Sequence, residues 1–233
     1  PGNPAAWKRH AVYHKKVKKQ WQTAEDGGVH QQRQREVAEK LARHAEQTGD
    51  EYEELMAEGA RYASQHDTRR AARACREAIA LRPDEPAAYS NLGGMLANSG
   101  HYVEAAQRFL EAKERMPVGS EGWARATAAA FNMLAGKECA EVTKPEWWND
   151  EGLKALSASV VRAAPDDGRA NEMRADLLSG RSYGAWEAGP RSAAELKKAA
   201  THFERAAALC PAPAVKAELT RRVDLCRCRA EAM

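Results

Sequence analysis

The chain has 233 residues, of which 43% are hydrophobic and 30% are charged, and its formal net charge is +3. This composition argues against wholesale disorder, and so small a charge does not indicate a nucleic-acid partner for the whole chain. Good helix formers dominate, no segment shows the alternation of a strand, and no stretch approaches the ~18 apolar residues of a membrane span. We therefore expect an all-α protein.

The cysteines and the start of the chain bear on its compartment. Five scattered cysteines do not form an even disulfide framework, and no apolar secretory signal is visible at the start. We expect an intracellular, cytoplasmic protein. The first residue is Pro1 rather than Met, so the sequence is compatible with a longer natural N-terminus.

Residues 1–28 form a basic N-terminal segment. Three aromatic residues, Trp7, Tyr13 and Trp21, are interleaved with its cations. Through residues 7–21 such a segment can bind nucleic acid or an anionic membrane, or it can be a solvated helix whose rings pack on the next helix. The six cations that precede the first acid are Lys8, Arg9, Lys15, Lys16, Lys18 and Lys19.

Residues 29–51 are expected to form an N-terminal capping helix or a degenerate repeat. Val37, Leu41 and Ala45 follow one another at intervals of four and predict a helix over 30–48. Gly27-Gly28 is expected to end a preceding helix over 4–22.

Two units of equal length follow, 52–85 and 86–119. Pro83 and Pro117 are 34 residues apart, and each ends an Ala-rich helical stretch. Each unit is predicted to hold two helices, A and B. The second unit carries Tyr89, Leu92, Gly93, Leu96, Gly100, Tyr102, Ala105, Phe109, Ala112 and Pro117, and the first carries Leu55, Gly59, Tyr62, Ala71, Cys75, Ala78 and Pro83.

This pattern resembles the tetratricopeptide repeat family, with departures at Glu58 and Cys75. The resemblance implies an α-solenoid of helix-turn-helix repeats forming a right-handed superhelix. Small residues are needed where helices A and B cross, so Gly59 and Gly93 are expected to lie opposite Ala71 and Ala105.

Two further units carry insertions. In residues 120–167, the first predicted helix contains Trp123 and ends at about Leu134. The insertion 135–149 follows, and then a helix from Asp150 to Ala164. Residues 168–212 give helices over 168–178 and 192–209, separated by the insertion 179–191. Residues 213–233 are expected to cap the stack. Trp147-Trp148 is expected to fold back over its repeat. For Tyr183 and Trp186 in the second insertion, packing over the repeat and binding of a partner both stay open.

The resemblance implies a protein–protein interaction scaffold that binds a peptide in the concave groove lined by helices A. Alternatives are an RNA- or membrane-associated adaptor acting through the basic segment, and a regulatory or oligomerisation module of a larger protein. The expected groove-facing residues are Met56, Ala60, Ala63 and Ser64 in the first unit, Ser90, Asn91, Gly94, Ala97 and Asn98 in the second, and Glu121, Ala124, Arg125, Ala128, Phe131 and Asn132 in the third.

One subfamily of these repeats clamps the C-terminal carboxylate of chaperones. Asn91 and Arg125 match its clamp, whereas Met56, Ala60 and Glu121 do not, so a chaperone tail is not the expected partner. No catalytic or cofactor motif occurs, and Cys226 and Cys228 face opposite sides of a helix. We therefore expect no enzyme activity, no cofactor and no metal.

Overall fold

The computed structural model describes residues 25–180 and 188–233, with side chains from residue 32 onward, and these residues form helices and turns without a strand. The helices are α2 (Glu25–Thr48), α3 (Glu51–Ser64), α4 (Thr68–Leu81), α5 (Pro86–Asn98), α6 (Tyr102–Glu114), α7 (Glu121–Leu134), the short η1 (Lys137–Cys139), α8 (Asp150–Ala163), α9 (Gly168–Ser179), α10 (Ala193–Leu209) and α11 (Pro213–Glu231).

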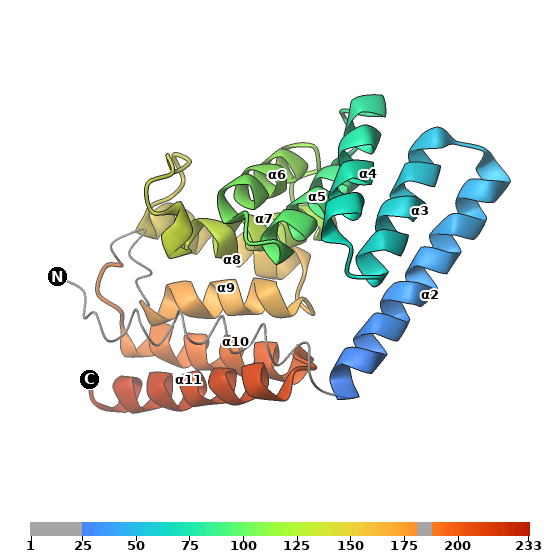
Figure 1. Ribbon diagram of the computed structural model, residues 1–233. Helices are drawn as coiled ribbons and strands as arrows, with labels where there is room; N and C mark the ends of the chain where they lie inside the picture. The colour runs from blue at the N-terminus through green and yellow to red at the C-terminus, as the bar shows by residue number, and fades with distance from the viewer. Residues whose placement is uncertain (1–24, 181–187) are drawn as a thin grey trace.

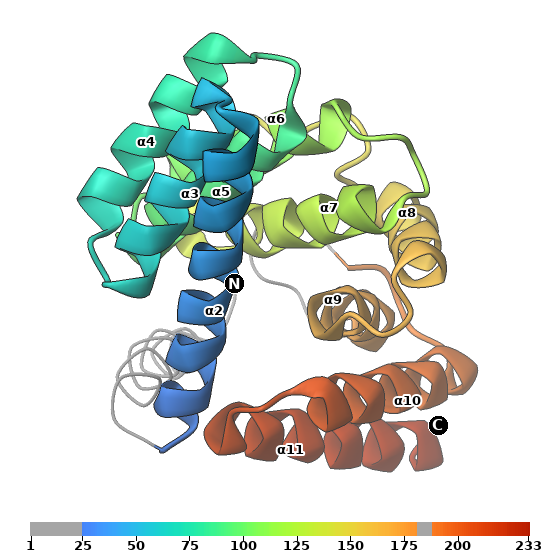
Figure 2. The ribbon, with the colours of Figure 1, turned by 90° about the vertical axis from the view of Figure 1, so that its right-hand side faces the viewer.

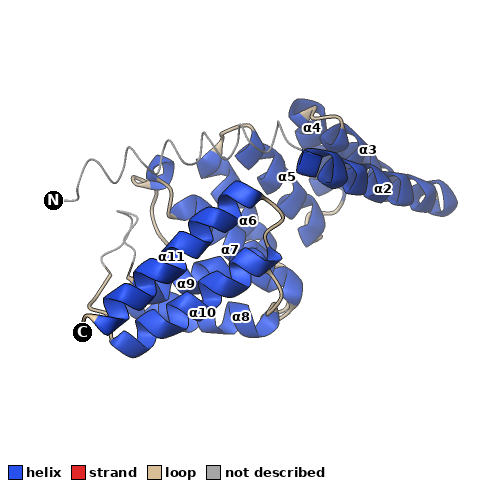
Figure 3. Cartoon of the chain, turned by 90° about the horizontal axis from the view of Figure 1, so that it is seen from below, coloured by secondary structure: helices blue, strands red, loops and turns tan. Residues whose placement is uncertain are grey.

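Each helix packs on the next one along the chain, so the helices form a stack (Figure 1). The pairs α3/α4, α5/α6, α7/α8 and α9/α10 are the A and B helices of successive repeats. α7 also packs on α9, which brings two A helices together (Figure 2). Seen from below, helices joined by loops make up the described chain (Figure 3). The architecture is therefore an α-solenoid of tetratricopeptide-like helix pairs.

The helix ends follow local signals in the sequence. Pro83, Pro117, Pro165 and Pro211 each stand within three residues of the end of a B helix. Side chains of Asp50, Asp67, Ser120, Asn149, Asp167 and Ser192 accept backbone N–H groups at helix starts. One expectation was wrong: Gly27-Gly28 ends no helix, because α2 already begins at Glu25.

The A and B helices cross closely at the two predicted glycines. A Cβ on Gly59 would lie 3.6 Å from Ala74 Cβ and 3.7 Å from Ala71 O, which is ordinary contact. A Cβ on Gly93 would lie 3.0 Å from the Phe109 ring. The expected partner of Gly93, Ala105, was therefore not the nearest residue, because the bulkier Phe109 ring fills the crossing.

α7 is the centre of the largest core cluster. Trp123, Ala128 and Phe131 are all buried in it, together with residues of α8 and α9. The insertion folds back as expected: Trp148 is 8% exposed and its ring centroid lies 5.5 Å from that of Phe131. Trp147 is half-buried beside Lys113 of α6, whose Nζ lies 5.5 Å from the ring centroid.

The turn between α3 and α4 holds a residue in a left-handed conformation. His66 has φ 61°, and the residue 34 positions later in the next repeat is Gly100 with φ 86°. A side chain disfavours this conformation, whereas glycine adopts it freely.

We predict that His66→Gly stabilises the protein by about 1 kcal/mol, because it removes this backbone strain. Gly100→Ala is the reciprocal change and should cost about 1 kcal/mol for the same reason. Urea denaturation followed by circular dichroism measures both. Two shifts of the same sign would contradict the assignment of a shared left-handed turn.

A charged cluster ties α8 to the start of α10. Arg191 is 6% exposed and donates to the Asp150 carboxylate and to Leu177 O. Lys154 lies 2.8 Å from Glu195, which also accepts from the Ser192 backbone N–H. The bond from Lys154, followed by the Ser192 N–H, lowers the pKa of Glu195 from 4.5 to about 2.

We predict that this carboxylate stabilises the protein above pH 4.5 and that its contribution is lost as the pH falls from 4.5 to about 2. The unfolded chain binds a proton in that interval while the folded chain does not. The free-energy difference between the wild type and Glu195→Gln should therefore shrink over this interval in urea titrations. A difference that stays constant with pH would contradict the assignment.

Candidate functional site

An uncharged stripe of small and amide residues lies exposed along α5. We call Ala87, Asn91, Gly94 and Asn98 the α5 stripe, because residues spaced by four and three lie on one side of a helix. Ala87, Asn91 and Asn98 are exposed, and a Cβ on Gly94 would meet nothing within 4 Å. At ~100° per residue, Asn91 and Asn98 lie nearly opposite Gly93, the residue that faces α6, and Gly94 lies about a quarter-turn from it.

The absence of charge sets α5 apart from the other described helices. Its sequence PAAYSNLGGMLAN contains no Asp, Glu, Lys or Arg, whereas each of the other helices in the described ranges has at least one. Exposed helix positions usually carry charged residues. Amide side chains can both donate to and accept from a peptide backbone, and small residues let that backbone approach closely.

The corresponding positions of the first repeat are covered. Ala57 and Ser64, which stand 34 residues before Asn91 and Asn98, are 6% and 4% exposed. Met56 is 7% exposed and packs with Tyr52, Ala78 and Ala88. The expectation that Met56 and Ser64 line the groove was therefore wrong, because both side chains are buried between helices; Ala60 and Ala63 are half-buried.

The third repeat exposes a short charged face instead. Arg125 lies close to the Glu121 carboxylate and 3.5 Å from Asp167 at the start of α9, so nearby acids balance its charge. Asn132 is half-buried. Ala124, Ala128 and Phe131 were wrongly expected to face the groove: all three are buried in the core around α7. Arg125 is therefore not placed to hold a partner's carboxylate by itself.

Ser90 and Ala97 flank the α5 stripe and are half-buried. Of the residues predicted for this face, Asn91 and Asn98 are exposed, and Gly94 is half-buried with open space where a Cβ would lie. Sequence reasoning missed Ala87 as a member of the stripe, although its spacing from Asn91 was a sufficient signal.

Four of the described cysteines lie in surroundings that favour the neutral thiol. Burial raises the pKa of the Cys75 thiol to about 11 and raises the pKa of Cys139, Cys210 and Cys226, so these thiols stay protonated at neutral pH. Among the described side chains, those of residues 32–180 and 188–233, there is no group of three His, Cys, Asp or Glu that could hold a metal ion.

The basic segment and the aromatic residues of the second insertion cannot be placed relative to the α5 stripe. The basic segment, with Lys8, Arg9, Lys15, Lys16, Lys18 and Lys19, lies outside the described residues, as do Tyr183 and Trp186 of the second insertion. Within the part of the chain that is described, each helix is too short or too polar to span a membrane.

Comparisons with known proteins give little further information. Protein-family models and curated proteins yield no match. Among solved structures, the chain is similar to one described as "MamA RS-1 ArsTM double mutant", with 17% sequence identity and a TM-score of 0.48; the similarity covers 79% of this chain and 98% of that one. A likeness at this level carries no function from one chain to the other, so the architecture rests on the helix pairs themselves.

Proposed function

We propose that this protein is a non-catalytic scaffold that binds a segment of another protein along the A-helix face of its repeats. The α5 stripe is the centre of this binding surface. The single observation that supports the proposal best is the exposed, uncharged stripe itself.

The chemistry of the stripe favours a peptide over a charged ligand. The exposed Asn91 amide can both donate to and accept from the backbone of an extended chain. Gly94 leaves open space for that chain to approach. The balanced charge of Arg125 further disfavours a carboxylate clamp of the chaperone-binding type.

A second candidate function involves the basic segment, which would bind RNA or an anionic membrane through its cations and aromatic rings. Such binding weakens steeply with salt, whereas binding at an uncharged stripe does not.

Affinity capture with four chains tests the proposal. The chains are the wild type, Gly94→Arg, the control Gln107→Arg, and a variant with Lys15, Lys16, Lys18 and Lys19 changed to Glu. Gln107 is an exposed residue of α6. We expect a protein retained at high salt by every chain except Gly94→Arg. Capture that only the lysine variant loses, and that salt removes, would support the second candidate and contradict the first.

A further inference from the structure

Arginines dominate the exposed side of α4. Its sequence TRRAARACREAIAL contains four arginines and a single acid. Arg69, Arg73 and Arg76 follow one another at intervals of four and three, so they lie along one side of the helix. All three are exposed, whereas Ala71 and Ala78 on the opposite side are fully buried. We call Arg69, Arg73 and Arg76 the α4 arginine row.

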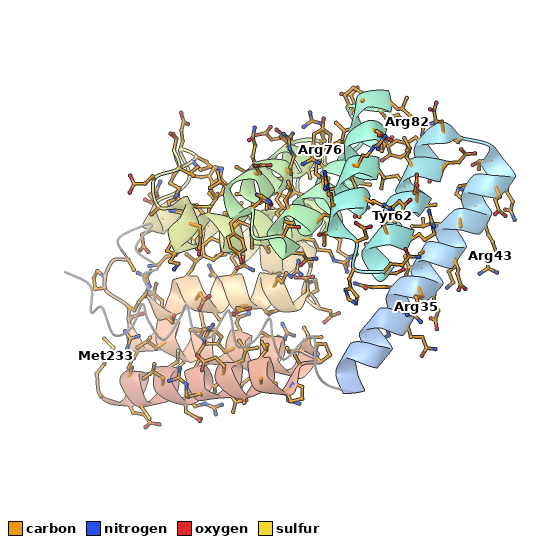
Figure 4. All side chains as sticks on the ribbon, viewed as in Figure 1. Arg35, Arg43, Tyr62, Arg76, Arg82 and Met233 are labelled. Carbon is orange, nitrogen blue, oxygen red and sulfur yellow. The ribbon has the colours of Figure 1, made fainter. Side chains whose placement is uncertain are left out.

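The α4 arginine row points away from the helices on which α4 packs. These helices are α3 and α5. A Cβ on Gly59 of α3 would lie 3.6 Å from Ala74 and from Cys75, which belong to the buried side of α4. Figure 4 shows Arg76 on the edge of α4 that is turned away from α3. The side chain of Arg73 is 80% exposed, so the row is open to an incoming ligand.

The charges of the row are only partly balanced within the chain. Arg73 lies 2.7 Å from Glu77. Arg69 and Arg76, on either side of Arg73, have no acid within ion-pair distance among the described residues. The row therefore presents two arginines whose charges are available to a ligand.

The start of α4 is electrostatically unfavourable for the helix. Its backbone N–H groups give a helix N-terminus a partial positive charge, which acids stabilise and cations destabilise. The first turn of α4 contains Arg69 and Arg70 but no acid. Asp67, which precedes the helix, balances Arg70 at 3.5 Å. Like charges four residues apart, such as Arg69 and Arg73, destabilise a helix further, so Arg69 lowers the stability of α4.

The repeat architecture does not require arginines at these positions. The residues 34 positions later, in the B helix of the next repeat, are Val103, Gln107 and Leu110, and none of them is charged. Local features that lower stability without a gain in packing concentrate at functional surfaces. The row therefore indicates a binding surface for an anion.

The surroundings of the row favour a short acidic protein segment over a nucleic acid. Guanidinium groups pair in two-point fashion with carboxylates and with phosphates. However, α3 contains four glutamates and one arginine, and α6 contains three glutamates against one arginine and one lysine. A phosphate backbone that extended beyond α4 would meet these acids, whereas a short segment with a few carboxylates can remain on α4.

We propose that the α4 arginine row binds an acidic segment of a protein, whose Asp or Glu side chains pair with Arg69 and Arg76. The row belongs to a B helix and is separate from the α5 stripe, so this inference stands independently of the proposed function. Because the pairs form at an exposed surface, the binding weakens as the salt concentration rises.

A peptide of alternating glutamate and serine, with a photoreactive residue at its centre, serves as the probe for the full-length chain. Its glutamates recur every ~6.6 Å when it is extended, close to the ~6 Å rise from Arg69 to Arg73. Mass spectrometry after irradiation identifies the residues that carry the peptide, which distinguishes α4 from the basic segment. We expect adducts on α4, and Arg69→Glu/Arg76→Glu should lower their yield at least about ten-fold.

Matched variants and a stability measurement make the outcome specific. Arg33→Glu/Arg35→Glu makes the same charge change at exposed residues of α2 and should leave the α4 adducts unchanged, as should Gly94→Arg in the α5 stripe. Urea denaturation should give a higher midpoint for Arg69→Glu, because an acid then stands in the first turn of α4.

Three results would overturn the inference. The first is adducts on the basic segment alone, and the second is α4 adducts that persist in the Arg69→Glu/Arg76→Glu variant. The third is displacement of the peptide from α4 by a lower concentration of oligouridylate than of unlabelled peptide, because the row would then favour phosphates over carboxylates. Each of them leaves the role of the α5 stripe untouched.

Discussion

Replacing Gly93 with Leu is expected to destabilise the protein by about 3 kcal/mol or more. The α5–α6 crossing has no room for a side chain, because even a Cβ would lie 3.0 Å from the Phe109 ring. Phe109 is 7% exposed and is held among residues of α4 and α7, so it cannot turn outward without opening the core. Urea denaturation monitored by circular dichroism gives the change in unfolding free energy.

The neighbouring glycine provides the control. Gly94→Leu adds the same side chain to the same helix, where a Cβ meets nothing within 4 Å. Leucine is a better helix former than glycine, so this variant should gain about 0.5–1 kcal/mol. Equal losses at the two positions would mean that α5 and α6 do not cross at Gly93.

Replacing Arg222 with Ala is expected to cost about 3–5 kcal/mol. Its guanidinium is buried between α9 and α11, 3.0 Å from Glu172 and 3.5 Å from Asp176, and it lies over the Phe203 ring. Asp176 is 3% exposed, so the substitution leaves a buried carboxylate without this cation. Hydrogen exchange in α11 and urea denaturation both report the loss.

The adjacent Arg221 is the control that distinguishes the effect of burying a charged pair from the effect of removing a charge. Arg221 pairs with Glu218 at 2.8 Å, but its side chain is 69% exposed. Such a surface pair is worth about 0–1 kcal/mol, so Arg221→Ala should change stability little. If the two variants lost the same stability, the Arg222 ion pairs would not be what fastens the end of the stack.

Sequence reasoning located most of the helices, because their ends depend on neighbouring residues. Pro83 and Pro117 end B helices, and α11 (Pro213–Glu231) lies within the predicted capping segment 213–233. The insertion 135–149 also folded back as expected, since two adjacent tryptophans are costly to expose. These features follow from signals within a few residues.

The surface was harder to predict, because it depends on which helices become neighbours. Met56 occupies a groove position of the repeat, yet it is buried against Ala78 and Ala88 from the next helices. Phe131 is buried because the insertion brings Trp148 onto it. Among the described helices, α4 and α6 pack on α5 and leave Asn91 exposed, and no short-range pattern encodes which helices become neighbours.

Site-specific photo-crosslinking tests the central claim most directly. A photoreactive amino acid replaces Asn91 in the α5 stripe or, as the control, Gln107 on α6, and both chains are irradiated in lysate. We predict a discrete protein adduct from position 91 that is absent from position 107 and is lost when Gly94→Arg is added. Adducts from position 107 alone, or adducts that contain nucleic acid rather than protein, would contradict a scaffold that binds through its A-helix face.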